Sequence, residues 1–180
     1  MQKTDTHIVF MGIPLDGNYQ VFGRKILQKG FKHGYKSYET GELKTFYNYA
    51  EYRDCYYGKW KGIPVNISIG YTPLSKIVRL VSISTYEFSY KWEEIKQLYE
   101  KIKKEYISVY GQPSPKLTNE NEPYTLTLYE SGIDFDYSCG FYVKNGRIFI
   151  LIDNFKKGLY ISILYVDDIN QTIYDNELNK

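Results

Sequence analysis

Aromatic side chains are the residues of this chain best suited to binding a ligand. Tyrosine accounts for 21 of the 180 residues, and aromatic residues together make up 18% of the chain. Their flat rings can stack on sugar rings, bases or peptide side chains at low entropic cost. Tyrosine is also a good strand former, and that preference alone would place many of these rings on a sheet. We predict an aromatic ligand-binding surface made of Tyr47, Tyr49, Tyr57, Trp60, Tyr129, Tyr137 and Tyr142.

Few residues could carry out acid–base or nucleophilic chemistry. Asp134 and Asp136 would share one face of a strand, at a spacing that suits a divalent ion or an acid–base pair. Cys139 could act as a nucleophile if the fold placed His33 beside it as a base. The sequence around them has no nucleophile elbow, glycine-rich phosphate loop or metal-ligand spacing. We therefore predict no catalytic residue, metal or cofactor, and an enzyme with its site at strand ends is the first alternative.

A nucleic-acid binder that uses an aromatic sheet is the second alternative. Residues 7 to 31 resemble the first strand and helix of an RNA-recognition motif, in which Phe10 would stack on a base. The second signature of that motif has no counterpart here. The formal net charge is only +2, and the lysines of the segment 90–110 alternate with glutamates. Such a mixed surface is typical of a solvated helix rather than of a polyanion-binding face.

The two cysteines, Cys55 and Cys139, are too far apart in sequence for a CxxC element. As a pair they permit one disulfide, which would fit an oxidising compartment. Both fall in strand-like segments, where buried free thiols are common, so separate thiols are the favoured interpretation.

Hydrophobic periodicity predicts the elements that would position these side chains. Helical spacing indicates helices over about 18–29 and 90–110, the second ended by Gly111 and Pro113. Period-two alternation dominates 31–87 and is clearest from Val65 to Tyr71. We predict a turn at 58–62 and a hairpin turn at 144–147. Further strands are expected at about 8–14, 77–85, 124–131, 133–144, 147–153 and 158–166.

These elements predict one α+β domain over residues 1–166, followed by a polar tail over 167–180. The sheet should be antiparallel, with about six to eight strands and two helices packed on one face. The order of elements indicates two similar α-β-β-β halves. The other face would be open, and many tyrosines should lie on it. The expected core is Phe22, Ile26, Val65, Ile67, Val81, Trp92, Ile95, Ile102, Ile150 and Ile163.

The opening FMGIPLDG, the helix after it and the KGF that ends it resemble uncharacterised secreted proteins of Bacteroidetes. The resemblance implies export to the periplasm or beyond, with a mature N-terminus left after signal removal. No stretch approaches the roughly 20 apolar residues of a membrane span. We therefore expect a non-catalytic binding or interaction module of the cell envelope. Its partner would be a glycan, a peptide or another protein, and the sequence does not choose among them.

Overall fold

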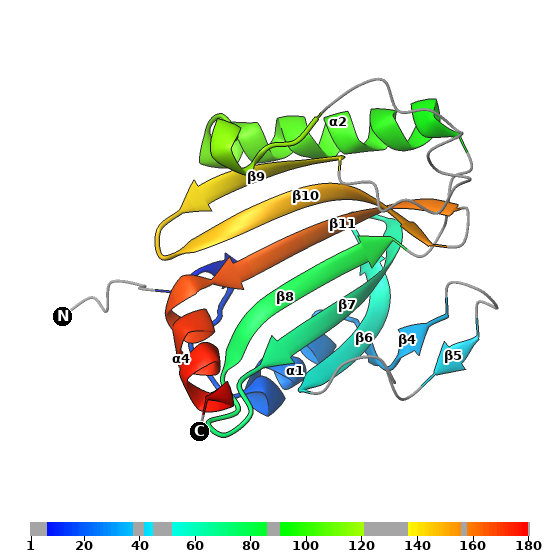
Figure 1. Ribbon diagram of the computed structural model, residues 1–180. Coiled ribbons are helices and arrows are strands. Elements are labelled where there is room, and N and C mark those ends of the chain that lie inside the picture. Colours follow the sequence, from blue (N-terminus) through cyan, green and yellow to red (C-terminus); the bar gives the residue numbers. More distant parts are fainter. Residues whose placement is uncertain are drawn as a thin grey trace.

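A seven-stranded antiparallel sheet forms the centre of the molecule, with strands in the order β3-β6-β7-β8-β11-β10-β9 (Figure 1). The structure is a computed structural model that describes residues 7–37, 42–44, 52–85, 91–120, 137–155 and 158–179. Its strands are β1 (Val9–Phe10), β2 (Ile13–Pro14), β3 (Lys32–His33), β4 (Tyr35–Lys36), β5 (Leu43–Lys44), β6 (Arg53–Trp60), β7 (Ile63–Tyr71), β8 (Val78–Thr85), β9 (Tyr137–Val143), β10 (Gly146–Phe155) and β11 (Gly158–Asp167). The helices are α1 (Tyr19–Gln28), α2 (Trp92–Tyr110), the 3-10 turn η1 (Pro115–Leu117) and α4 (Asp168–Leu178).

Both predicted helices, α1 and α2, cover the same face of the sheet. Strand register places Ile67, Ile83 and Ile163 side by side across β7, β8 and β11, so all three point to one face. These isoleucines share one hydrophobic core with Phe22 and Ile26 of α1 and with residues of α2. Figure 1 shows α1 behind β6 and β7 and α2 alongside β9 and β10. The predicted α+β fold, with two helices on one face, is confirmed.

The predicted core is correct apart from one residue that is only partly buried. Trp92 packs against the core from the first turn of α2 but remains partly exposed. The others are buried, namely Phe22, Ile26, Val65, Ile67, Val81, Ile95, Ile102, Ile150 and Ile163.

Two α-β-β-β units meet at the middle of the sheet. In the first, α1 precedes the antiparallel strands β6, β7 and β8, and in the second, α2 precedes β9, β10 and β11. Their third strands, β8 and β11, pair antiparallel with Ile83 opposite Ile163. The order of elements therefore repeats across this β8–β11 junction, as the sequence indicated, and the first unit carries β3, β4 and β5 in addition.

The face opposite α1 and α2, here called the open face, is lined mainly by serine rather than by tyrosine. Ser68 pairs with Ser82, and Ser84 pairs with Ser162 across neighbouring strands. The expectation that many tyrosines lie on the open face is wrong for the sheet strands that the structure describes. Large apolar bodies gain most from the side that the helices dry, and the tyrosines buried there are Tyr56, Tyr99, Tyr106, Tyr137 and Tyr165.

Turn chemistry shifts two of the predicted boundaries. The expected strand over 8–14 is a tight hairpin, since Met11 and Gly12 have φ of 50° and 77° and reverse the chain between β1 and β2. The turn expected at 58–62 is confined to Lys61 and Gly62, again with positive φ, so Gly58 to Trp60 belong to β6. Two left-handed residues suit the right-handed twist of a hairpin. The hairpin at 144–147 is confirmed by the pairing of Val143 with Gly146.

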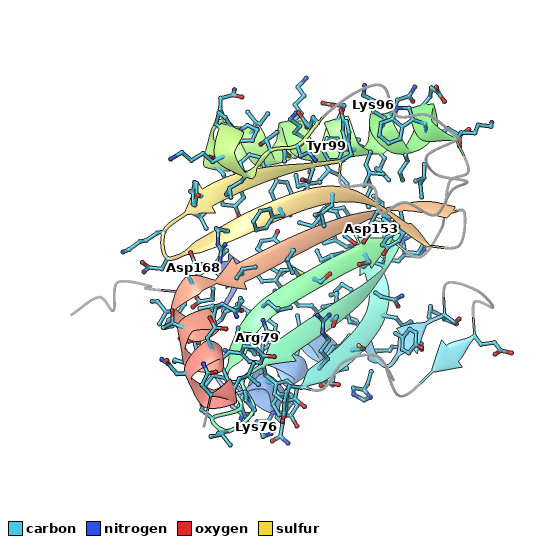
Figure 2. All side chains as sticks on the ribbon, in the orientation of Figure 1. Lys76, Arg79, Lys96, Tyr99, Asp153 and Asp168 are labelled. Atoms are coloured by element: carbon cyan, nitrogen blue, oxygen red, sulfur yellow. The ribbon has the colours of Figure 1, made fainter. Side chains whose placement is uncertain are left out.

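The segment 167–180, expected to be a polar tail, instead contains helix α4. The fully buried carboxylate of Asp167 starts the helix, because its Oδ1 accepts a hydrogen bond from Asn170 N at 2.9 Å. Asn170 is also buried, and its Nδ2 donates to the carbonyl of Val78 at 2.9 Å. The Arg79 guanidinium lies 3.8 Å from the centroid of the Tyr174 ring (Figure 2). Polar contacts hold this helix, so an apolar stripe could not reveal it.

The predicted strand over 124–131 and the first part of the one over 133–144 lie outside the described residues. Within the described part of the chain, no helix is both long and apolar enough to cross a membrane.

Candidate ligand-binding site

The predicted aromatic residues lie in different parts of the molecule. Tyr57 and Tyr142 point to the open face from β6 and β9, with four strands between them. Tyr137 is buried on the helix-covered face, where its ring meets those of Trp92 and Tyr99 edge-on. Trp60 lies on the same helix-covered face at the end of β6. Tyr47, Tyr49 and Tyr129 lie outside the described residues.

Trp60 lines a hollow with a cavity volume of about 390 Å³, here called the aromatic hollow. It lies where the end of α2 passes the end of β6, and four aromatic rings contribute to its walls. The lining residues are Met11, Trp60, Lys61, Glu105, Tyr106, Ser108, Val109, Tyr110 and Tyr165.

Three local features of the chain bring these residues together. The turn at Lys61 ends β6 at Trp60. The last turns of α2 present Tyr106, Val109 and Tyr110, whose i, i+3 and i+4 spacing puts them on one side of the helix. Gly111, with φ of 81°, then ends the helix, so the hollow opens at a helix terminus.

A pair of phenols forms the polar part of the floor. The hydroxyl groups of Tyr106 and Tyr165 share a hydrogen bond and are buried. Burial raises the pKa of both groups well above the ordinary value for tyrosine. The phenols therefore stay protonated and serve as hydrogen-bonding groups under physiological conditions.

An ion pair and exposed apolar side chains form the rim. Lys61 pairs with Glu105 of α2, and its Nζ lies 5.0 Å from the centroid of the Trp60 ring. Val109 is 70% exposed and Tyr110 is 38% exposed, so the rim on the α2 side is open to solvent. The arrangement offers aromatic surface with hydrogen-bonding groups at its edges.

Sequence reasoning found Trp60 but missed its neighbours. Tyr106 and Val109 belong to the predicted apolar stripe of the helix, and Tyr165 follows a predicted strand. Their shared position depends on how α2 crosses the sheet, which is a tertiary relationship without a local signal.

The residues considered for catalysis are not gathered into one site. His33 lies on β3, at the edge of the sheet opposite β9, which carries Cys139. Cys139 is buried beneath α2, close to the Tyr99 hydroxyl, and burial raises the pKa of its thiol to about 11. Asp134 and Asp136 lie outside the described residues. In the described ranges, no three histidine, cysteine or acidic side chains are grouped so that they could hold a metal ion.

The two thiols are separate. Cys55 points to the open face of β6 and Cys139 to the helix-covered face of β9, and both are free and buried. Four strands and the thickness of the sheet lie between them, which no disulfide can span.

Comparison with protein-family models, with curated proteins and with solved structures finds no match for this chain. The resemblance to an RNA-recognition motif has no support in the geometry. Phe10 is fully buried against Phe22 and Tyr165, so its ring cannot stack on a base. The site must therefore be interpreted from its own residues.

Proposed function

We propose that this chain is a non-catalytic binding module of the cell envelope and that the aromatic hollow takes a sugar ring of a glycan. The observation that carries the proposal is the gathering of Trp60, Tyr106, Tyr110 and Tyr165 around one hollow. Binding sites for small ligands combine apolar and aromatic walls with a few polar groups that fix orientation.

A pyranose ring suits this combination because it has apolar C–H faces and a polar edge. Its faces can stack on Trp60 and Tyr110. Its hydroxyl groups can bond to the phenols of Tyr106 and Tyr165 and to the Lys61–Glu105 pair at the rim. A peptide with an aromatic side chain makes fewer of these polar contacts.

The groups in the hollow support binding rather than catalysis. Lys61 and Glu105 are paired with each other, and the two phenols share a hydrogen bond. Burial moves the pKa of Tyr106 and Tyr165 upward, away from the neutral range in which an acid–base catalyst works best. Export to the periplasm or beyond is supported by the resemblance of the FMGIPLDG segment to secreted proteins.

The two tryptophans of the chain allow a direct test. The variant Trp92→Phe leaves Trp60 as the only tryptophan, and Trp60→Phe leaves Trp92, which does not line the hollow. Both would be titrated with panels of oligosaccharides, peptides and oligonucleotides while tryptophan emission is followed. We expect a saturable change with an oligosaccharide in Trp92→Phe and none in Trp60→Phe.

A pair of tyrosine variants locates the ligand. Tyr110→Ala should weaken binding by about three- to tenfold, the cost of losing one aromatic contact. Tyr142→Ala is the matched control, since Tyr142 is 58% exposed on the open face outside the hollow. Loss of binding in Tyr142→Ala alone would move the ligand to the open face. A response only to peptides would change the ligand class, and salt-sensitive binding of oligonucleotides would favour the nucleic-acid alternative. No response to any panel would contradict the proposal.

A further inference from the structure

A second hollow lies at the other end of β6, between that strand and α1. Arg53 begins β6, whereas Trp60 of the aromatic hollow ends it, so the two sites are separate. The second hollow also has a cavity volume of about 390 Å³. The residues that matter for its chemistry are Tyr19, Arg24, His33, Arg53, Asp54 and Tyr71.

The only carboxylate in this lining is fully engaged by its neighbours. Asp54 Oδ1 lies 2.7 Å from His33 Nε2 and accepts from Cys55 N at 3.0 Å. Its Oδ2 accepts from the Tyr56 hydroxyl at 2.6 Å. Asp54 therefore holds the imidazole of His33 in place and has little capacity left to neutralise a more distant cation.

The arginines of this lining have no such partner. Within the described ranges neither Arg24 nor Arg53 forms an ion pair, and the one hydrogen bond of Arg53 is a 3.4 Å contact from Nη1 to Ser68 Oγ. A third cation stands close by, because Lys76 Nζ lies 5.5 Å from the centroid of the Tyr71 ring. Figure 2 shows Lys76 at the turn between β7 and β8. Positive charge thus exceeds negative charge around the hollow.

The aromatic wall of the second hollow is rigid. The rings of Tyr19 and Tyr71 stack with centroids 4.0 Å apart and planes 13° from parallel. A fixed wall beside uncompensated guanidinium groups favours a small anion, because a hollow lined by one sign of charge concentrates ligands of the other sign.

From this arrangement we propose that the second hollow binds an oxyanion, the phosphate or carboxylate group of a small ligand, through Arg24, Arg53 and His33. The planar guanidinium fork matches both groups and can bond to two of their oxygens at once. His33 adds a donor from the opposite side of the hollow, since its side chain is 55% exposed although one ring nitrogen contacts Asp54.

The test uses the full chain and two probes, inorganic phosphate and glucuronate. Each is added to ¹⁵N-labelled protein while amide chemical shifts are recorded. We expect saturable shifts at Arg24, His33 and Arg53 and none at Trp60. A response to phosphate alone indicates a phosphate ester as the natural ligand, and a response to glucuronate alone indicates a carboxylate. Absence of saturable shifts at these amides with both probes would overturn the proposal.

The variant Arg24→Gln should weaken binding about tenfold or more, the effect of losing a charge-assisted bidentate contact. Lys25→Gln is the matched control, because Lys25 is the next residue of α1, is exposed and does not line the hollow. Equal weakening in both variants would reduce the effect to general charge attraction and would also overturn the proposal. Trp60→Phe should leave phosphate and glucuronate binding unchanged, which keeps this result independent of the glycan site.

Discussion

The side-chain amide of Asn66 holds the main chain of Lys36 at both its polar groups. Asn66 Oδ1 accepts from Lys36 N at 2.8 Å, and Asn66 Nδ2 donates to Lys36 O at 2.9 Å. Asn66 lies on the open face of β7, and Lys36 ends β4. These two bonds therefore fix β4 across the open face beside β6 and β7, where a second contact comes from Lys36 Nζ over the Tyr57 ring at 5.5 Å.

Replacing Asn66 should release this strand. Asn66→Ala leaves the N–H and C=O of Lys36 without their partners, so we expect the free energy of unfolding to fall by about 1–3 kcal/mol. Urea unfolding would measure that loss. Amide hydrogen exchange at Lys36 should accelerate much more than exchange in β7 itself.

Ser82→Ala is the control for Asn66→Ala, because Ser82 occupies the same open face on the neighbouring strand β8. The control should change the stability little and leave exchange at Lys36 as it was. Unchanged exchange at Lys36 in Asn66→Ala would show that other contacts hold β4.

Much of the fold could be predicted because its signals are local. Val65, Ile67 and Ile69 alternate with polar residues, and the structure buries all three under the helices. The apolar stripe of α2 runs through Ile95 and Ile102, and both are buried. A period of two or of 3.6 residues is a property of one segment, so sequence alone reveals it.

Other features depend on partners far away in the chain. Helix α4 starts on Asp167, whose Oδ2 also accepts from the N–H of Ile8 at 3.1 Å, a contact across nearly the whole sequence. Strand preference placed the tyrosines on the sheet but does not say which face the helices cover. Trp60 was a candidate for its residue type alone, and the hollow beside it forms only when Tyr110 of α2 arrives.

Gly23 is a glycine inside a helix that close packing requires. A Cβ added to Gly23 would overlap the Tyr56 hydroxyl oxygen and lie 2.9 Å from Tyr56 Cζ. The hydroxyl cannot move aside easily because Asp54 Oδ2 holds it at 2.6 Å. Alanine usually stabilises a helix by about 1 kcal/mol relative to glycine. Here we expect Gly23→Ala to destabilise the protein by about 1–3 kcal/mol in urea unfolding, because overpacking outweighs that gain.

The double variant Gly23→Ala/Tyr56→Phe separates overlap from any other effect of the alanine. Removing the hydroxyl should recover part of the loss, so the two changes should be non-additive. Gly17→Ala serves as the control, since a Cβ there would meet nothing within 4 Å. Additive losses in the double variant would contradict the overlap as the cause.

The thiols of Cys55 and Cys139 should make the protein less stable as the pH rises. Burial raises the pKa of each thiol from 9.0 to about 11. Between these values the unfolded chain gives up a proton that the folded chain keeps, so the free energy of unfolding decreases with pH. We expect each thiol to contribute a loss on the order of 1–3 kcal/mol as the pH goes from about 9 to 11. Below pH 9 this contribution is fully retained.

Buried tyrosines titrate over the same range, so the thiol contribution must be isolated by comparison. Urea unfolding of the natural chain, of Cys55→Ala and of Cys139→Ala at several pH values gives the difference due to each thiol, because the tyrosine contribution is common to all three. That difference should shrink above pH 9 for both variants. Native protein at pH 8 should also react slowly with iodoacetamide at both positions, since the thiolate is the reactive form and both side chains are buried. Rapid alkylation of Cys139 in the folded protein would mean that α2 opens easily from β9, and the packing of that helix over the sheet would need revision.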